Sequence, residues 1–174
     1  SIAATIGYAA VAENLFFKQS EVHGMSQRGG AVQSHFRLSD KEIFSDLIPL
    51  GKADIIISVE PMEALRYLPW LSKDGWLITN TEPYINIPDY PPIESLMSEL
   101  SKIKNVVALN ADKIAKELKT SKSANMAVLG AASPHLGLKY EQLEKAIHTL
   151  FAKKGEKIVE DNTRALKAGL NYAN

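Results

Sequence analysis

The segment ADIIISVE at residues 53–60 constrains the fold of this chain more than any other part of the sequence. Its run of β-branched residues is nearly continuous and ends at a carboxylate, which is typical of a parallel strand buried on both faces. Pro61 follows, where the first turn of a helix tolerates proline, and residues 62–68 carry an apolar stripe. The next apolar strand is GWLITN at residues 75–80. We therefore predict a compact β-α-β unit over residues 53–80.

Strands and helices also alternate outside this unit. The predicted elements are a proline-rich loop at 81–93, a helix near 92–103, a strand at 105–109, a helix at 111–119 that Asn110 can cap, and an apolar helix at 123–132. Two more helices have apolar stripes, at Leu143, Ile147, Leu150 and Phe151 and at Ile158, Val159, Leu166 and Leu170. This order predicts an α/β fold, a three-layer, mostly parallel, Rossmann-like open sheet with helices on both faces and a helical C-terminal part.

The N-terminal part adds a buried helix and two strands. Residues 1–15 are small and apolar with no turn signal before them, so we expect a helix that begins before Ser1, with a strand and turn upstream of the sequence. A strand rich in aromatic and β-branched residues follows at 15–22. Residues 31–38 alternate, which predicts a strand with one buried face. The buried side would hold Val32, Ser34, Phe36 and Leu38, and the other side Gln33, His35 and Arg37. We expect a single domain over residues 1–174.

Composition excludes several function classes. The chain has 174 residues, 45% of them hydrophobic and 23% charged, as in a soluble globular domain. Twenty Lys and Arg balance twenty Asp and Glu, so no net field favours nucleic acid or an anionic membrane. No apolar run approaches the roughly 18–20 residues of a membrane span, and no export signal is visible. The chain has no cysteine, which excludes disulfides, thiolate metal sites, cysteine nucleophiles and iron–sulfur ligation by this chain. We expect a cytoplasmic protein.

The segment SEVHGMSQRGG at residues 20–30 is the strongest candidate for a site. Its glycines allow positive φ and close backbone approach, and Arg28 offers a planar cation that suits a carboxylate or a phosphate. The candidate residues are Glu21, His23, Gly24, Met25, Gln27, Arg28, Gly29 and Gly30. Such a turn between two strands suits an anion or a partner surface. The alternative is a glycine turn whose polar side chains satisfy local backbone groups.

Other chemistry-bearing residues give weaker signals. Glu21 and His23 share a strand face, but no third ligand lies nearby and His35 is twelve positions away, so we predict no metal site. We expect His135 to be a capping or surface histidine and His148 to be exposed. No serine lies in a G-x-S-x-G turn, and we predict no catalytic residue on this chain.

Two strand ends lie on the rim where α/β proteins bind ligands. These are the Glu60–Pro61 and Asn80–Thr81 junctions. Either junction could line a cleft, although turn formation explains both equally well. A nucleotide site would be expected at a glycine-rich turn after the first strand, and that turn would precede Ser1.

With residues 20–39 in view, the chain resembles the gamma-type domain of the 2-oxoacid:acceptor (ferredoxin) oxidoreductases. More narrowly, it is similar to the small beta subunits of the indolepyruvate ferredoxin oxidoreductases. The matching segments are SEVHGMSQRGGAVQSHFRLS, ADIIISVEPMEALRYLPWL with GWLITNT, NVVALNADKIAKEL and SANMAVLGAAS, so the resemblance spans essentially the whole chain. Family members usually open with a strand and a loop of the kind G-x-G-G-Q-G, which is not in this sequence.

The resemblance implies an enzyme subunit that is inactive alone. The family reaction is oxidative decarboxylation of a 2-oxoacid with coenzyme A, which gives an acyl-CoA, carbon dioxide and reduced ferredoxin. It also implies that thiamine diphosphate and iron–sulfur clusters belong to a large (alpha) partner subunit, and that this chain binds no cofactor of its own. The absence of cysteine agrees with that division. Ferredoxin would bind through the complex, and the isolated chain could form a homodimer.

We hypothesise that residues 21–30 lie at the interface with the large subunit, where Arg28 and the glycines shape the approach of coenzyme A or substrate. The alternative is that the segment only braces the interface. Two other functions stay open: the gamma subunit of a pyruvate, 2-oxoglutarate or branched 2-oxoacid oxidoreductase, and a stand-alone nucleotide-binding or interaction module.

Overall fold

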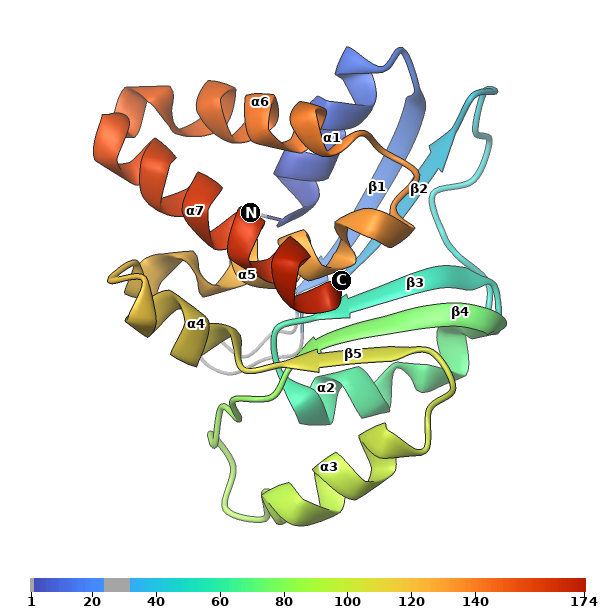
Figure 1. Cartoon of the computed structure of the whole chain (residues 1–174). Helices are drawn as coiled ribbons and strands as arrows, with labels where there is room; N and C mark the ends of the chain where they lie inside the picture. The colour runs from blue at the N-terminus through green and yellow to red at the C-terminus, as the bar shows by residue number, and fades with distance from the viewer. Residues whose placement is uncertain (1, 24–31) are drawn as a thin grey trace.

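The computed structural model describes residues 2–23 and 32–174 (Figure 1). The candidate residues Gly24, Met25, Gln27, Arg28, Gly29 and Gly30 lie outside this range. The elements are α1 (Ile2–Ala12), β1 (Phe16–His23), β2 (Val32–Ser39), β3 (Ala53–Ser58), α2 (Pro61–Arg66), β4 (Leu71–Asn80), α3 (Ile93–Ser101), β5 (Val106–Leu109), α4 (Ala111–Glu117), α5 (Ala124–Ala132), α6 (Tyr140–Phe151) and α7 (Glu156–Ala173). Short 3-10 turns follow α2, α4, α5 and α6.

A parallel sheet of order β3-β4-β5 forms the centre of the molecule and confirms the predicted α/β class. Figure 1 shows α2 and α3 on one side of this sheet and α4, α5 and α7 on the other, so the three layers are present. Side chains of β4 alternate between the two layers, as the pleat requires. Leu77 packs with Ala64 of α2 and Leu100 of α3, whereas its neighbour Ile78 packs with Val128 and other residues of α5.

The observed strands differ from the predicted ones in two respects. β4 begins at Leu71, four residues before the predicted start at residue 75, because Leu71 already pairs with Ala53 of β3, and the register then shifts before Ile55 pairs with Trp76. β1 and β2 form an antiparallel ribbon of their own. Among the described residues the outer edge of β3 therefore has no strand beside it.

The prediction of one buried face on β2 was wrong. His35, on the side predicted to be polar, is 9% exposed, whereas Val32 is 57% exposed. The ribbon is contacted on both faces, which removes the expected alternation. Phe36 and Leu38 pack against the core cluster of α1, α6 and α7, and the Phe36 ring stacks on Phe17 with centroids 5.3 Å apart. His35 faces the opposite way, toward the Trp70 ring.

The C-terminal helices are as predicted, and α5 and α7 cross in unusually close contact. A Cβ added to Gly130 would lie 1.9 Å from the carbonyl oxygen of Leu166, and one added to Gly169 would lie 1.8 Å from that of Ala127. The backbones of α5 and α7 are therefore in direct contact, because Gly130 and Gly169 have no Cβ to hold them apart. No described helix is both long and apolar enough to cross a membrane.

Candidate functional site

A cleft of about 850 Å³ opens at the carboxyl ends of β3 and β4 and continues along the open edge of β3. Its wall comes from β2, β3, α2, the loop after β4, and the N-terminal parts of α4 and α5. The lining residues of the rim are Ser58, Val59, Glu60, Glu63, Asn80, Glu82, Tyr84, Asn86, Asp112 and Asn125. Both strand ends that the sequence marks as rim positions, Glu60 and Asn80, thus line one cleft, as expected for an α/β sheet.

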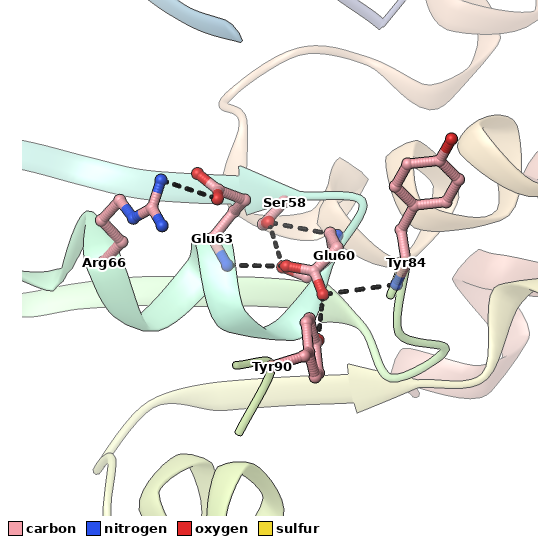
Figure 2. Close-up of polar contacts among 6 residues, drawn as sticks. All are labelled: Ser58, Glu60, Glu63, Arg66, Tyr84 and Tyr90. Carbon is pink, nitrogen blue, oxygen red and sulfur yellow. Dashed lines mark hydrogen bonds and ion pairs between the residues drawn. The ribbon is translucent and has the colours of Figure 1, made fainter. Parts of the chain in front are cut away.

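The Glu60 carboxylate, at the end of β3, accepts hydrogen bonds both from α2 and from the loop after β4. Its side chain is the N-cap of α2, where Oε2 accepts the backbone N–H of Glu63 at 2.8 Å. Its Oε1 accepts the Tyr90 hydroxyl and, at 3.5 Å, the backbone N–H of Tyr84 (Figure 2). Ser58 fixes the backbone below, since its Oγ donates to the Glu60 carbonyl at 2.7 Å. Glu60 is only 9% exposed, so these donors replace the water that the carboxylate loses.

The hydroxyl of Tyr90 is held as a donor to Glu60. Burial first, and then the hydrogen bond to Glu60 and its charge, raise the pKa of Tyr90 well above its usual value. The phenol therefore stays protonated and remains a donor. Arg66 forms an ion pair with Glu63 at 3.0 Å, which neutralises the adjacent carboxylate rather than Glu60 (Figure 2).

Asn80 links the other strand end to α4. Its Nδ2 donates to the Val59 carbonyl at 3.2 Å and to Asp112 Oδ2 at 2.7 Å. Its Oδ1 accepts the backbone N–H groups of Ala111 at 2.9 Å and Glu82 at 3.3 Å. One amide that is 5% exposed thus joins β3, β4, α4 and the loop after β4. Because both donors and the acceptor of the amide are used, its role is to fix the rim.

The described lining of the cleft is acidic. It carries four carboxylates, of Glu60, Glu63, Glu82 and Asp112, and one lysine, Lys122. A multiply charged anion would need further cations, from residues outside the described part or from another chain. No group of three or more His, Asp or Glu side chains among the described residues could hold a metal ion.

The structure describes only part of the predicted site. Glu21 lies exposed on β1 and accepts a hydrogen bond from Gln19 at 3.3 Å, while His23 ends that strand. The ribbon end that follows residues 24–31 borders the cleft, because Val32, Gln33, Ser34 and His35 line it. Residues 24–31 themselves lie outside the described part of the chain.

His35 and His135 have structural roles, whereas His148 lies in solvent. His35 Nδ1 accepts the backbone N–H of Ile48 at 2.9 Å, and its Nε2 lies 3.0 Å from the Gln33 amide. His135 was predicted to be a cap or a surface group, but its ring stacks on Trp76 with centroids 3.9 Å apart, and burial lowers its pKa. His148 is exposed, as predicted.

Comparison with known proteins identifies the family. Residues 1–172 match the family described as pyruvate ferredoxin/flavodoxin oxidoreductase. The chain belongs to this family. It is 36% identical over 177 residues to the indolepyruvate oxidoreductase subunit IorB of Archaeoglobus fulgidus, which covers 97% of this chain and 86% of that protein. The pyruvate/ketoisovalerate oxidoreductases common subunit gamma of Pyrococcus furiosus is 28% identical, covering 91% of this chain and 82% of its own.

Solved structures show the same fold. The gamma subunit of a keto/oxoacid ferredoxin oxidoreductase from Geobacter sulfurreducens aligns with a TM-score of 0.70 at 22% identity, over 99% of this chain and 89% of that one. The 2-oxoglutarate:ferredoxin oxidoreductase of Magnetococcus marinus aligns with a TM-score of 0.74 at 19% identity. That match covers 99% of this chain but only 28% of the Magnetococcus chain, so this fold also occurs as part of a longer polypeptide.

Sequence reasoning found the two strand ends but missed the groups that they hold. Tyr84 and Tyr90 are 24 and 30 residues from Glu60, Asp112 is 32 residues from Asn80, and none of the three belongs to a motif. The available signal was indirect. A carboxylate just before a proline at a predicted helix start is a good N-cap, and its second oxygen needs another donor when the cap is buried.

Proposed function

We propose that this chain is the small subunit of an indolepyruvate (aryl-pyruvate) ferredoxin oxidoreductase. The reaction would convert a 2-oxoacid and coenzyme A into an acyl-CoA and carbon dioxide, with the electrons passing to ferredoxin. The observation that carries the proposal is the similarity to four IorB subunits, at 32–36% identity over 97% of this chain. The gamma subunit of the Pyrococcus pyruvate and ketoisovalerate enzymes is less similar, at 28%.

The chemistry of the chain suits a subunit that shapes a site rather than one that carries redox groups. It has no cysteine with which to ligate an iron–sulfur cluster. Thiamine diphosphate and the clusters would therefore belong to a large alpha subunit, the main partner, and ferredoxin would bind through the complex. Under this proposal the chain is inactive alone, acts in the cytoplasm, and can pair with a second copy when isolated.

The match to the Pyrococcus gamma subunit supports one second candidate. In that case the chain would serve an enzyme for pyruvate, 2-oxoglutarate or a branched 2-oxoacid. The fold and the acidic rim are compatible with either substrate class, so the substrate must be measured.

Reconstitution tests the proposal. The chain and its large subunit are mixed without oxygen, and CoA-dependent viologen reduction is followed with indolepyruvate, phenylpyruvate, pyruvate and 2-oxoglutarate. We expect activity that needs both chains and the highest kcat/KM for the aryl substrates. A preference for pyruvate or 2-oxoglutarate would establish the second candidate. A complex that is inactive on every oxoacid would contradict both.

We further propose that the segment with Glu21, His23, Gly24, Met25, Gln27, Arg28, Gly29 and Gly30 borders the approach of coenzyme A or oxoacid. Support comes from two observations. Residues 32–35, directly after it, line the cleft, and the described lining carries four carboxylates but one lysine. An anion at this cleft would therefore depend on a further cation, which Arg28 offers.

Replacing Arg28 tests this role. In the reconstituted enzyme, Arg28→Ala is expected to lower kcat/KM for CoA or oxoacid by roughly tenfold to a hundredfold, as for the loss of charge-assisted hydrogen bonds. Arg164→Ala is the matched control, because Arg164 is exposed on α7. Normal assembly together with unchanged kcat/KM for both substrates would leave the segment as an interface brace only.

The open edge of β3 supports one more part of the proposal. A β-branched strand of a parallel sheet normally has neighbours on both sides, and Ile55, Ile56 and Ile57, which are only half-buried here, line the cleft along this edge. We propose that the strand predicted upstream of α1 pairs here. It would fill the part of the cleft beside β3 and leave the rim around Glu60 and Asn80 as the ligand-facing part.

A further inference from the structure

The loop between β4 and α3 crosses the rim with little support of its own. Residues 81–92 include the prolines Pro83, Pro88, Pro91 and Pro92, which have no backbone N–H, and the loop contains no helix or strand. Yet it supplies Glu82, Pro83, Tyr84 and Asn86 to the wall of the cleft. Its side chains Tyr84 and Ile85 are 69% and 67% exposed, so burial of these two side chains contributes little to holding the loop.

The loop is tied to the two strand ends. At its start, the Glu82 N–H donates to Asn80. Further along, the Tyr84 N–H and the Tyr90 hydroxyl both donate to Oε1 of Glu60. Figure 2 shows both tyrosines converging on this one oxygen while the ring of Tyr84 points away from it. Tyr90 lies near the end of the loop, just before α3, so its contact with Glu60 holds the far end of the loop.

Glu60 is itself held rigidly. Its Oε2 caps α2 through the Glu63 N–H, and Ser58 hydrogen-bonds its backbone on both sides, at 2.7 Å and 3.3 Å. A carboxylate has two acceptor oxygens, so one side chain can bind donors from α2 and from the loop together. Hydrogen bonds to a charged, buried acceptor are stronger than neutral ones.

We propose that Glu60 is a positioning residue that fixes the 81–92 loop as one wall of the cleft. It acts through Tyr90 and the Tyr84 backbone and touches no reacting group. The identity of the ligand rests on the proposed function, under which this wall contacts the oxoacid or coenzyme A. Without this tie the loop would keep the contacts of Glu82 with Asn80 and Asn110 but lose its anchor on Glu60, and the shape of the cleft would vary.

Tyr90→Phe removes only the hydroxyl, which donates to Glu60 and also accepts the Met62 backbone N–H, and it leaves the cap that Glu60 forms with the Glu63 N–H in place. Tyr172→Phe is the matched control, since it removes a hydroxyl that donates to the Ala108 carbonyl far from Glu60. Backbone amide hydrogen exchange of the purified chain is the measurement. We expect exchange in residues 82–90 to be roughly tenfold to a hundredfold faster in Tyr90→Phe, with the amides of α2 after Met62 unchanged. Equal exchange rates for residues 82–90 in Tyr90→Phe and Tyr172→Phe would contradict the proposed link between Tyr90 and Glu60.

A double variant shows whether Tyr90 acts through Glu60. Glu60→Gln keeps the volume but offers one acceptor oxygen where the carboxylate offers two, so it also releases part of the network. If both residues belong to one tie, Glu60→Gln/Tyr90→Phe exchanges about as fast in this loop as the faster single variant. Additive effects would mean that Tyr90 stabilises the loop independently of Glu60.

The reconstituted enzyme tests the consequence for the cleft. We expect Tyr90→Phe to raise KM for the oxoacid or for CoA by about tenfold and to leave kcat within about twofold, as for lost uniform binding. Tyr172→Phe should leave both constants unchanged. Faster loop exchange with both KM values unchanged would overturn the positioning role. An inactive wild-type complex would instead contradict the proposed function, while the exchange result on the single chain would stand.

Discussion

Gly130→Ala is expected to destabilise this protein by about 3 kcal/mol or more, near the upper end of overpacking costs. The added Cβ would lie 1.9 Å from the carbonyl oxygen of Leu166 and 2.8 Å from its carbonyl carbon. These are backbone atoms of α7, so no side-chain rotation can relieve the contact. The two helices must separate along a crossing where Met126, Leu129 and Leu166 are fully buried.

The same crossing offers a reciprocal variant and a matched control. Gly169→Ala meets the Ala127 carbonyl oxygen at 1.8 Å and is expected to cost a similar free energy. In contrast, an added Cβ at Gly7 of α1 meets the Phe17 ring at an ordinary 3.5 Å. Gly7→Ala should therefore be neutral or stabilise by up to about 1 kcal/mol, because alanine is the better helix former.

Urea unfolding of the three single variants and the double variant measures these effects. Because Gly130 and Gly169 lie at the same crossing of α5 and α7, one separation of the helices relieves both clashes, and Gly130→Ala/Gly169→Ala should cost less than the sum of the single changes. If Gly130→Ala unfolds at the same urea concentration as Gly7→Ala, the close crossing of α5 and α7 is contradicted.

The sequence predicted the central layers well because burial there follows from local pattern. The β-branched run 53–60 and the strand 75–80 became neighbouring parallel strands. Asn110 caps α4, as predicted, through its acceptance of the Lys113 N–H at 2.7 Å. The ribbon β1–β2 was harder. Alternation indicates a buried face only when one side meets solvent, and here α1 covers one side while Trp70 and Ile48 approach the other.

The location of the site could be predicted from the sequence, but its hydrogen-bond network could not. The end of a buried strand fixes the location of a rim residue, so Glu60 and Asn80 could be named from the sequence. Their partners depend on the path of loop 81–92 and on where α4 begins, and tertiary packing sets both. The close approach of Gly130 and Gly169 was equally hidden, since neither glycine differs by pattern from other helical glycines.

Asn80→Asp is the second substitution with a large expected effect, a loss of about 3 kcal/mol at pH 7. The change replaces the Nδ2 donor with a second acceptor. The Val59 carbonyl loses its donor, and two carboxylates would face each other where Asn80 and Asp112 now lie 2.7 Å apart. Since residue 80 is only 5% exposed, water cannot replace the lost hydrogen bonds.

The pH dependence of unfolding separates repulsion from lost hydrogen bonds. In Asn80→Asp, burial and the neighbouring carboxylate raise the folded-state pKa of the new carboxyl above its unfolded value of about 3.9. The destabilisation is therefore complete above the raised pKa and shrinks as the pH falls toward the unfolded value. In urea unfolding, the difference in the free energy of unfolding between Asn80→Asp and wild type should be smaller at pH 4.5 than at pH 7.

The charge-swapped variant Asn80→Asp/Asp112→Asn provides the control for Asn80→Asp. It restores one donor and one acceptor between the two side chains but leaves the Val59 carbonyl without its donor, so it should recover about half of the loss at pH 7. Asp112 is exposed in the first turn of α4, and Asp112→Asn alone should cost less than about 1 kcal/mol. A loss in Asn80→Asp that is the same at both pH values, with no recovery on swapping, would mean that the two side chains do not interact. The rim would then be held by the backbone contacts of residue 80 rather than by its pairing with α4.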